Sequence, residues 1–332
     1  MEGATAIITG ITGQDGSYLR DLLLRKGYEV HGLLRSHAAW DSQPDSERLQ
    51  LHVANLADAD SLMSLMAEIR PHEVYHLAAQ SNVRASFEAP LTTTDANAMG
   101  TLRLLEAVRR SQYAVGHEIR FFHASSSEIF APNPLGPLTE TSPIDPQSPY
   151  GISKACAHWS VRTYRETYGL YASNGILFNH ESPLRPETFV TRKITKAVAR
   201  IAHGVQKHLT LGALESQRDW GYAGDYVQGM WLMLQQEEPD DYLLATGAAH
   251  SVEDFTRAAF AHVGLDYRKY IQQDEKFLRP KDVPCRIGDP AKARTKLGWE
   301  PRVGFADLVK LMVEADLEQV ARETRRGLRQ AG

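Results

Sequence analysis

The chain has 332 residues, 42% of them hydrophobic and 23% charged, with a formal net charge of -4. This length allows one large domain with a smaller attachment, or two domains, and the lack of a basic excess argues against nucleic acid as a partner. Cys156 and Cys285 form no CxxC pair, and no signal-like or membrane-length apolar segment occurs, so we expect a cytoplasmic protein without disulfides, a metal site or membrane contact.

Short apolar runs alternate with segments of helical periodicity through the first half of the chain. The predicted strands cover residues 6–9, 28–34, 49–53, 73–77, 119–124 and 174–178, and the predicted helices cover 17–26, 58–69, 92–111, 150–167 and 186–203. This alternation predicts an α/β fold with a Rossmann-type, doubly wound parallel sheet. From about residue 179 the pattern is mixed, with helices expected at 225–236, 252–263 and 305–323. We expect a dinucleotide-binding domain over residues 1–178, joined by parts of 221–250, and a smaller, interleaved domain mainly over 179–332.

A glycine-rich turn follows the first predicted strand. Gly10, Gly13 and Gly16 have the spacing G-x-x-G-x-x-G and precede a helix. Gly10 suits a sharp turn, Gly13 lets the backbone approach a pyrophosphate, and Gly16 permits close helix packing. Such a triplet can also be a structural loop, but its position between a strand and a helix favours dinucleotide binding.

Arg35 ends the second predicted strand, where an NAD-binding protein has a carboxylate for the ribose. Its guanidinium can pair with a 2'-phosphate, and the Ser36 hydroxyl can add a hydrogen bond. The alternative is an ordinary solvated arginine. We therefore expect NADP to bind more tightly than NAD.

Two clusters of polar residues predict a catalytic site. If a helix begins near Pro149, Tyr150 and Lys154 share one face of it, and the lysine ammonium is expected to lower the pKa of the phenol. The strand before Ser126 ends at the ligand-binding edge of such a sheet, and Glu128 lies two residues further on. A surface tyrosine with a solvated lysine, and a serine loop that bonds its own backbone, are the structural alternatives. A serine, tyrosine and lysine suffice for hydride transfer, whereas loss of a hydroxyl needs a further acid/base such as Glu128.

The glycine turn together with Ser126, Tyr150 and Lys154 resembles the extended short-chain dehydrogenase/reductase family. Longer runs resemble its GDP-mannose 4,6-dehydratase branch from end to end. These runs are GITGQDGSYL at 10–19, SSSE at 125–128, SPYG at 148–151, GILFNHESP at 175–183, FVTRK at 189–193, RDWG at 218–221, MWLMLQ at 230–235, ATG at 245–247, LRP at 278–280 and LGWEPR at 297–302.

The resemblance implies roles for the catalytic residues Ser126, Glu128, Tyr150 and Lys154. Tyr150, assisted by Lys154, takes the C4 hydroxyl proton of GDP-mannose, and Ser126 holds the C4 oxygen. Glu128 removes the C5 proton and helps water to leave from C6. The implied product is GDP-4-keto-6-deoxymannose, with NADP regenerated in each turnover.

The resemblance also implies two sets of binding residues. The cofactor-binding set is Gly10, Thr12, Gly13, Gln14, Asp15, Gly16, Arg35, Asn55, Leu56, Leu77, Ala78, Ala79, Gln80, Tyr150, Lys154, His180 and Arg185. The substrate-binding set is Ser81, Ser127, Asn179, Lys193, Arg218 and Arg279. The three basic residues of the second set suit a diphosphate, although each alone can be a surface salt bridge.

Three departures from the family pattern are visible. Ser126 replaces a threonine, Asn55 replaces an aspartate at the adenine position, and a serine-rich loop after Arg35 is replaced by residues 36–40. Because the family loop reaches a neighbouring subunit, a homodimer or a homotetramer both remain open, with a dimer expected through the helix that follows Tyr150.

Three alternative functions remain open. A dehydratase or epimerase for another GDP sugar, such as a heptose, differs only in pocket shape. GDP-4-keto-6-deoxymannose reductase can carry serine at position 126, but the run at 179–183 argues against it. A non-catalytic NADP-binding sensor is disfavoured because Tyr150, Lys154 and Glu128 are all present.

Overall fold

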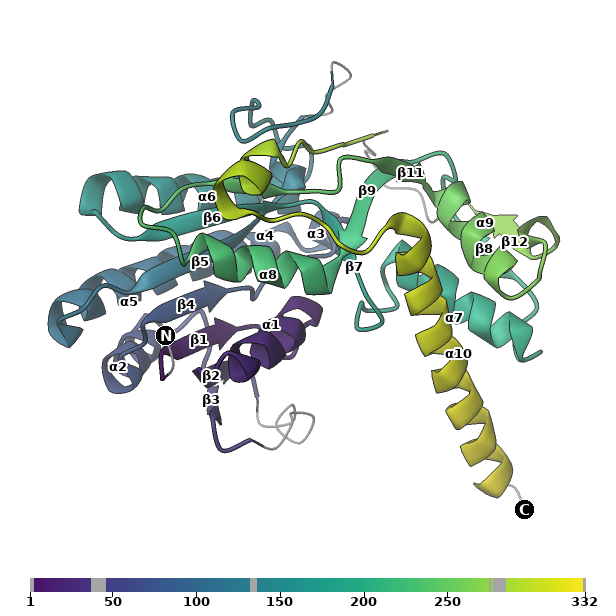
Figure 1. The fold of residues 1–332 in the computed structure, drawn as a ribbon, viewed down its shortest axis with the longest axis horizontal. Coiled ribbons are helices and arrows are strands. Elements are labelled where there is room, and N and C mark those ends of the chain that lie inside the picture. Colours follow the sequence, from purple (N-terminus) through teal and green to yellow (C-terminus); the bar gives the residue numbers. More distant parts are fainter. Residues whose placement is uncertain (1–2, 37–45, 132–135, 275, 277–284, 331–332) are drawn as a thin grey trace.

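The large sheet is entirely parallel. The computed structural model describes residues 3–36, 46–131, 136–274, 276 and 285–330, and within them seven strands pair in the order β10-β6-β5-β4-β1-β2-β3 (Figure 1). The strands are β1 (Thr5–Thr9), β2 (Glu29–Leu34), β3 (Leu49–Val53), β4 (Glu73–His76), β5 (Arg120–Ser126), β6 (Ala172–Leu177) and β10 (Tyr242–Leu244). The strand order reverses at β1, between β2 and β4, which places the ligand-binding crevice at the carboxyl ends of these strands. The predicted Rossmann-type fold is confirmed.

Helices cover both faces of this sheet. The buried side chains of β1 alternate: Ala6 and Ile8 belong to the cluster with α1 (Gln14–Arg25) and α8 (Ala223–Met233). Ile7 belongs to the opposite cluster, with α2 (Ala59–Ile69), α5 (Gly100–Val115) and α6 (Pro149–Tyr168). A two-residue alternation within a fully buried strand therefore serves two helical layers at once.

Helix α6 carries the Tyr150 and Lys154 pair and has clear start and stop signals. The Ser148 side chain accepts a hydrogen bond from the Gly151 backbone N–H at 3.0 Å, and Pro149 occupies the first turn. Gly169, with φ of +65°, ends the helix in the left-handed region. The predicted start of this helix is confirmed to within one residue.

The helix expected over residues 92–111 is interrupted. The chain instead forms α3 (Val83–Glu88), α4 (Pro90–Thr94), the π-helical turn η2 (Asp95–Met99) and then α5. A single π turn inside a helix re-aims the residues around it. Here it presents Asn97 to the loop that follows β4.

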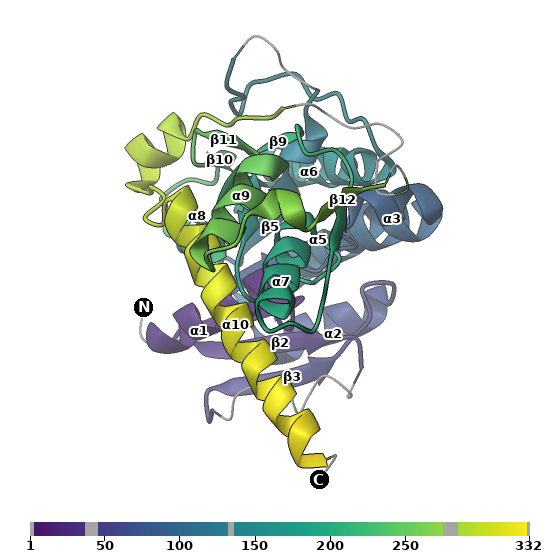
Figure 2. The same cartoon turned by 90° about the vertical axis from the view of Figure 1, so that its right-hand side faces the viewer.

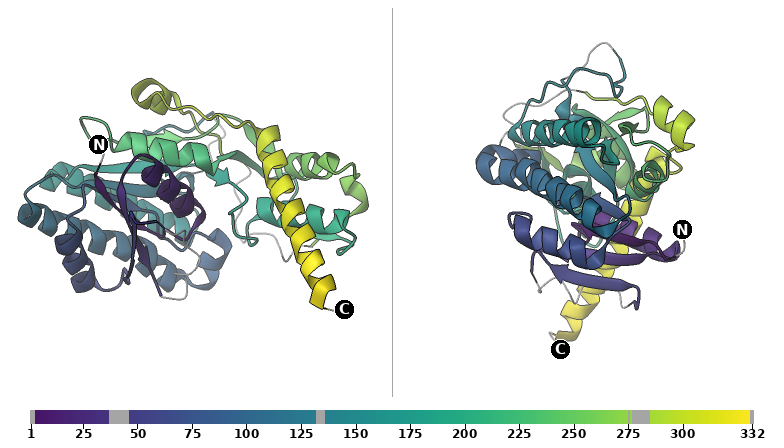
Figure 3. Two further views of the ribbon diagram at one scale, coloured as in Figure 1. Left: turned by 60° about the horizontal axis from the view of Figure 1, so that its bottom comes forward. Right: turned by 90° about the vertical axis from the view of Figure 1, so that its left-hand side faces the viewer.

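The second lobe lies beyond the carboxyl ends of the large sheet (Figures 1 and 2). One small sheet has the order β11-β9-β7, from β7 (Asn179–Glu181), β9 (Gln217–Tyr222) and β11 (Ala249–Ser251). The other pairs β8 (Leu209–Leu211) with β12 (Ile271–Gln273). Their core is shared by α7 (Val190–Ala202), α9 (Val252–His262) and α10 (Phe305–Gln330), the last of which projects at its C-terminal end (Figure 3). Short turns complete the chain at η3 (Ser127–Ile129), η4 (Tyr267–Lys269) and η6 (Ala293–Leu297).

Strand β10 returns from the second half of the chain to pair with β6. The division into domains at residue 178 stays a prediction. None of the described helices is both long and apolar enough to cross a membrane.

Candidate active site

A cavity of about 1010 Å³ opens at the carboxyl edge of the large sheet and extends into the second lobe. Every residue of the predicted catalytic and binding sets that the structure describes lines it. Arg279 lies outside the described residues. The roles assigned to these residues stay predictions, but side chains up to about 200 positions apart in sequence share one cavity.

The glycine turn has the geometry that a dinucleotide needs. Gly10 has a φ of +74°, and an added Cβ would lie 2.9 Å from the Ala78 Cα atom. A Cβ at Gly16 would lie 2.2 Å from the Gly10 carbonyl oxygen, so only glycine lets α1 approach β1 this closely. Helix α1 begins at Gln14, three residues earlier than predicted, and no side chain caps its Gly13 N-terminus. Its first-turn N–H groups are therefore available to a phosphate.

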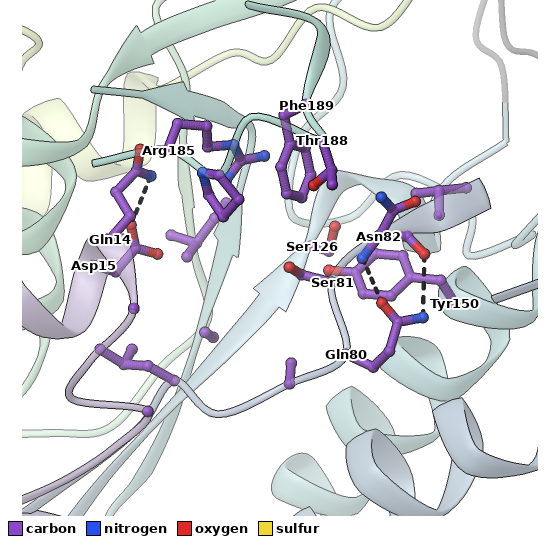
Figure 4. Close-up of a pocket in the computed structure, with 18 of the residues that line it drawn as sticks. Gln14, Asp15, Gln80, Ser81, Asn82, Ser126, Tyr150, Arg185, Thr188 and Phe189 are labelled. Atoms are coloured by element: carbon purple, nitrogen blue, oxygen red, sulfur yellow. Dashed lines mark hydrogen bonds between the residues drawn. The ribbon is translucent and has the colours of Figure 1, made fainter. Parts of the chain in front are cut away.

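Tyr150 is buried beside Ser126, and Figure 4 shows the two side chains within the cavity. Burial is the main effect on the phenol and raises its pKa to about 12. A hydrogen bond with Ser126 lowers the pKa, the Glu128 charge raises it, and Arg185 lowers it. The predicted lowering of the Tyr150 pKa is therefore wrong for the free protein, because desolvation outweighs the Ser126 hydrogen bond and the Arg185 charge.

Lys154 is also buried, with 4% of its surface exposed. Its ammonium donates a hydrogen bond to the Ala124 carbonyl at 2.7 Å, and burial lowers its pKa to about 8. The lysine thus lies on the same helix face as Tyr150, as predicted. Burial therefore disfavours the charged form of both groups, the Lys154 ammonium and the Tyr150 phenolate.

Glu128 lies in the η3 turn directly after β5. The Ser126 hydroxyl accepts a hydrogen bond from the Glu128 backbone N–H at 3.2 Å, which fixes the start of the turn. The Glu128 carboxylate forms an ion pair with Arg286, with 2.8 Å between Oε2 and Nη1. The sequence did not indicate Arg286, because it follows an apparent loop and belongs to no recognised motif.

The glycine turn is tied to the second lobe through β7. The Gln14 side chain donates to the His180 carbonyl at 3.0 Å and accepts from the Ser182 hydroxyl at 2.8 Å. The His180 ring contacts the Phe178 carbonyl with Nδ1 and the Asp15 carboxylate with Nε2, at 2.7 and 2.8 Å. Two acceptors favour the doubly protonated imidazolium.

The pKa values of the Asp15 and His180 pair move apart. Burial lowers the pKa of His180, but the Asp15 charge and hydrogen bond more than offset it, so the pKa is raised above 6.5. Burial likewise opposes ionisation of Asp15, and His180 more than offsets it, so the Asp15 pKa lies below 3.8. The pair is therefore an ionic link across the cavity.

The loop after β4 is held by Asn97. The Asn97 side chain accepts from the Gln80 N–H at 2.8 Å, donates to the Gln80 carbonyl at 3.0 Å and donates to the Ser153 hydroxyl at 3.0 Å. Gln80 in turn bonds the backbone of Asn82, as the dashed lines in Figure 4 mark. Asn97 was missed because it lies inside a predicted helix; a buried amide between apolar positions was its only signal.

Further cationic groups line the cavity. Arg35 is exposed at the end of β2, Arg218 lies on β9, and Lys193 lies on α7. Burial lowers the pKa of Lys193, and the charge of Arg84, a further lining residue that the sequence did not indicate, lowers it too. Arg185 stacks over the Phe189 ring at 3.7 Å and pairs with Glu181 at 3.2 Å.

Asn55 also lines the cavity, in a local turn. Its amide oxygen accepts from the Ala57 N–H at 3.0 Å. Most of the divergent loop after Arg35 lies outside the described residues. Among the described residues, no group of three or more His, Cys, Asp or Glu side chains is arranged to hold a metal ion.

Comparison with known proteins identifies the family. The family described as GDP-mannose 4,6 dehydratase matches residues 7–312. GDP-mannose 4,6 dehydratase 2 of Arabidopsis thaliana is 52% identical over 96% of this chain and 88% of its own length. The chain belongs to the GDP-mannose 4,6-dehydratase family. Family members in Yersinia enterocolitica and Homo sapiens are 44% and 43% identical over 95% and 94% of this chain, and over 94% and 91% of their own lengths.

Solved structures place this dehydratase family among nucleotide-sugar enzymes. A dTDP-glucose 4,6-dehydratase from Streptomyces venezuelae, solved with NAD bound, is 25% identical with a TM-score of 0.82, over 95% of this chain and 97% of its own. A UDP-glucose 4-epimerase from Thermotoga maritima, solved with UDP-glucose, is 26% identical with the same TM-score, over 95% and 99%. The predicted resemblance is thereby confirmed.

Proposed function

We propose that this protein dehydrates GDP-mannose to GDP-4-keto-6-deoxymannose, using a transiently reduced nicotinamide cofactor. The observation that carries the proposal is the meeting of Tyr150, Ser126 and Glu128 in one cavity, in a chain of this family. Oxidation and reduction alone do not require Glu128. A carboxylate beside the tyrosine adds the acid/base function that elimination of water needs.

The glycine turn and the first turn of α1 would hold the cofactor pyrophosphate. A bound nicotinamide dinucleotide supplies the hydride acceptor for C4 and the hydride donor for C6. We assign NADP as the preferred form, since Arg35 at the end of β2 offers a guanidinium to a 2'-phosphate and β2 presents no carboxylate there. Equal affinities for NADP and NAD in calorimetric titration, unchanged in Arg35→Ala, would contradict this assignment.

The first proton transfer is assigned to Tyr150. Its oxygen takes the C4 hydroxyl proton, and the Ser126 hydroxyl donates a hydrogen bond to the oxygen that becomes the C4 ketone. Because the phenol is neutral in the free protein, it must lose its own proton first. Arg185 and the Ser126 hydrogen bond favour that loss, and Lys154, with a pKa of about 8, supplies a nearby group that exchanges protons near neutral pH.

Elimination is assigned to Glu128. The C4 ketone acidifies the C5–H bond, and the carboxylate takes that proton while the electron pair moves into the C4 oxygen. The resulting enolate re-forms the ketone and expels the C6 hydroxyl, to which the protonated Glu128 returns the proton as water leaves. The C5 and C6 atoms are then joined by a double bond. Hydride return to C6, with delivery to C5 of the proton that Tyr150 took from the C4 hydroxyl, gives the product.

The diphosphate of the sugar nucleotide is assigned to Lys193 and Arg218. Both line the part of the cavity formed by the second lobe, away from the glycine turn. Charge-assisted hydrogen bonds from two cations suit this group. Three neutral side chains line the same cavity and offer hydrogen bonds to the sugar: Ser81, Ser127 and Asn179. Arg279 remains assigned to the diphosphate.

We further propose that the protein forms at least a homodimer through α6. This helix exposes Ile152 and Trp159, with 55% and 48% of their surfaces accessible, and the two residues share one face because they are two turns apart. Large apolar side chains exposed on one helix face are typical of a subunit interface. Analytical sedimentation tests this assignment. A monomeric wild type, or a Trp159→Glu variant with the same mass as wild type, would contradict it.

The proposed reaction is tested by incubating the protein with NADP and GDP-mannose without added reductant. Mass spectrometry should show the loss of one water. Glu128→Gln should accumulate reduced-cofactor absorbance without losing water, whereas Glu106→Gln, which removes a carboxylate from the remote α5 surface, should behave like wild type. If GDP-mannose stays unchanged but a GDP-heptose is converted, the protein acts on another GDP sugar. If GDP-mannose stays unchanged but the 4-keto product is reduced with NADPH, the protein is the reductase.

A further inference from the structure

Arg286 reaches Glu128, a residue that lines the cavity, from a distant part of the chain. Only 3% of its surface is exposed. Its Nη1 atom lies 2.8 Å from the Glu128 carboxylate, and its Nη2 atom donates to the Phe130 carbonyl at 3.1 Å. One guanidinium therefore holds both the side chain of Glu128 and the backbone two residues further along.

The residues that directly follow Arg286 are fixed by hydrogen bonds and close packing. The Leu138 N–H donates to the Ile287 carbonyl at 2.7 Å, and the Asp289 N–H donates back to the Leu138 carbonyl at 2.8 Å. A Cβ atom at Gly288 would lie 2.5 Å from the Ala245 Cβ atom, so the chain approaches β10 as closely as glycine allows. This anchoring leaves the arginine little freedom to move.

Asp219 adds a third anchor. Its carboxylate accepts hydrogen bonds from the Thr246 and Gly247 N–H groups at 2.8 and 3.0 Å, and from Gly288 N–H at 3.3 Å. It thereby ties β9, next to Arg218, to the segment that delivers Arg286. The guanidinium is presented by a fixed scaffold, as a positioning group requires.

We propose that Arg286 is a positioning residue that orients Glu128 and keeps its carboxylate ionised for proton abstraction at C5. This inference rests on the proposed function. A carboxylate in a largely desolvated site takes up a proton readily unless a cation faces it, and a guanidinium that bridges it to the backbone also restricts its direction.

The same cation serves the second half of the elimination. Once Glu128 holds the C5 proton, the neighbouring positive charge favours the return to carboxylate. This makes the protonated carboxyl a better acid toward the departing C6 hydroxyl. Arg286 therefore favours the proton return through its charge, and favours the abstraction by keeping the carboxylate ionised and oriented, without contacting the sugar in the proposed mechanism.

The test isolates the C5 step from hydride transfer. Wild type and Arg286→Met, each with NADP bound, are incubated with GDP-4-keto-6-deoxymannose in deuterated water, and deuterium entry at C5 is followed by NMR. We expect exchange to slow by roughly 10- to 100-fold in the variant, with its pH dependence moved to higher pH. Arg286→Lys, which keeps the charge but not the bridge to Phe130, should recover part of the rate.

A control and a double variant separate positioning from folding. Arg165→Met removes an arginine that pairs with Asp241 at the same 2.8 Å, and it should exchange C5 at the wild-type rate. In a Glu128→Gln background, Arg286→Met should cause little additional loss. An equal loss in both backgrounds, or wild-type exchange with an unshifted pH dependence in Arg286→Met, would overturn the inference.

Failure of the proposed function would give a different result. In that case the wild-type protein itself would neither dehydrate GDP-mannose nor exchange C5 of the keto sugar, and the role of Arg286 would fall with it. If the wild type is active and Arg286→Met exchanges C5 at the wild-type rate, only the positioning role of Arg286 is overturned, and the proposed function stands.

Discussion

Replacing Lys154 by methionine should greatly slow turnover and yet stabilise the protein at neutral pH. The side chain is 4% exposed, and its pKa falls from 10.5 to about 8 on folding, mainly through burial. Since a change of one in pKa corresponds to about 1.4 kcal/mol, the buried ammonium costs the folded state about 3 kcal/mol. Loss of the hydrogen bond from this charged donor to the Ala124 carbonyl offsets about 2 kcal/mol, which leaves a net gain of about 1 kcal/mol.

The sign of the pH dependence follows from the lowered pKa. Below pH 8 the lysine is protonated in both the folded and the unfolded state, and the full penalty is present. Between pH 8 and 10.5 only the unfolded chain remains protonated, so the penalty disappears as pH rises. The stability difference between Lys154→Met and wild type should therefore shift by about 3 kcal/mol in favour of wild type between these limits.

Chemical denaturation of both proteins at about pH 7 and pH 10 measures this difference. Turnover should fall roughly 10²- to 10⁴-fold in the variant, because the tyrosine loses its proton-exchanging neighbour. A variant that is less stable than wild type at pH 7, or whose difference from wild type does not change with pH, would show that the buried Lys154 ammonium does not destabilise the folded state.

Three further predictions concern the frame of the cavity. Gly16→Ala places a Cβ atom 2.2 Å from a backbone oxygen, so the variant should lose about 1–3 kcal/mol of stability and should lose cofactor binding in calorimetry. Gly304→Ala is the control: an added Cβ there meets nothing within 4 Å, and neither stability nor cofactor binding should change. His180→Gln should lower the melting temperature most between about pH 4 and 6.5, where both His180 and Asp15 are charged. The loss of melting temperature should shrink at higher pH, as His180 loses its proton, and at lower pH, as Asp15 gains one. A difference that does not depend on pH would argue against the ionic link. Asn97→Ala leaves the Gln80 backbone groups unpaired and should cost about 1–3 kcal/mol while raising KM; unchanged KM and unfolding midpoint would show that the loop does not depend on it.

The elements that depend on local pattern could be predicted from the sequence. The alternation of apolar runs with helical periodicity predicted the parallel sheet, and the start of α6 followed from Ser148 and Pro149. Helix α1 began three residues early because Gly13 acts as its N-cap without a side-chain signal. Four strands of the second lobe, β7, β8, β11 and β12, were missed because three-residue strands carry too little pattern to stand out, and the six-residue β9 was missed as well.

The features that depend on tertiary contact could not be predicted in this way. Arg286 meets Glu128 from about 160 positions further along the chain, and nothing in its own sequence neighbourhood marks that contact. The pKa of Tyr150 was predicted in the wrong direction because the spacing to Lys154 shows a cation nearby but does not show how completely both groups are buried. The π turn that aims Asn97 was hidden inside an ordinary helical pattern.

The most direct test of the account follows the hydrogen that leaves C4. GDP-mannose deuterated at C4 is converted by the protein with NADP and no added reductant, and the product is examined by mass spectrometry and NMR. The account predicts a product that has lost one water and carries the deuterium at C6, with no net reduction of the cofactor. Unchanged substrate, or a dehydrated product without deuterium at C6, would contradict it.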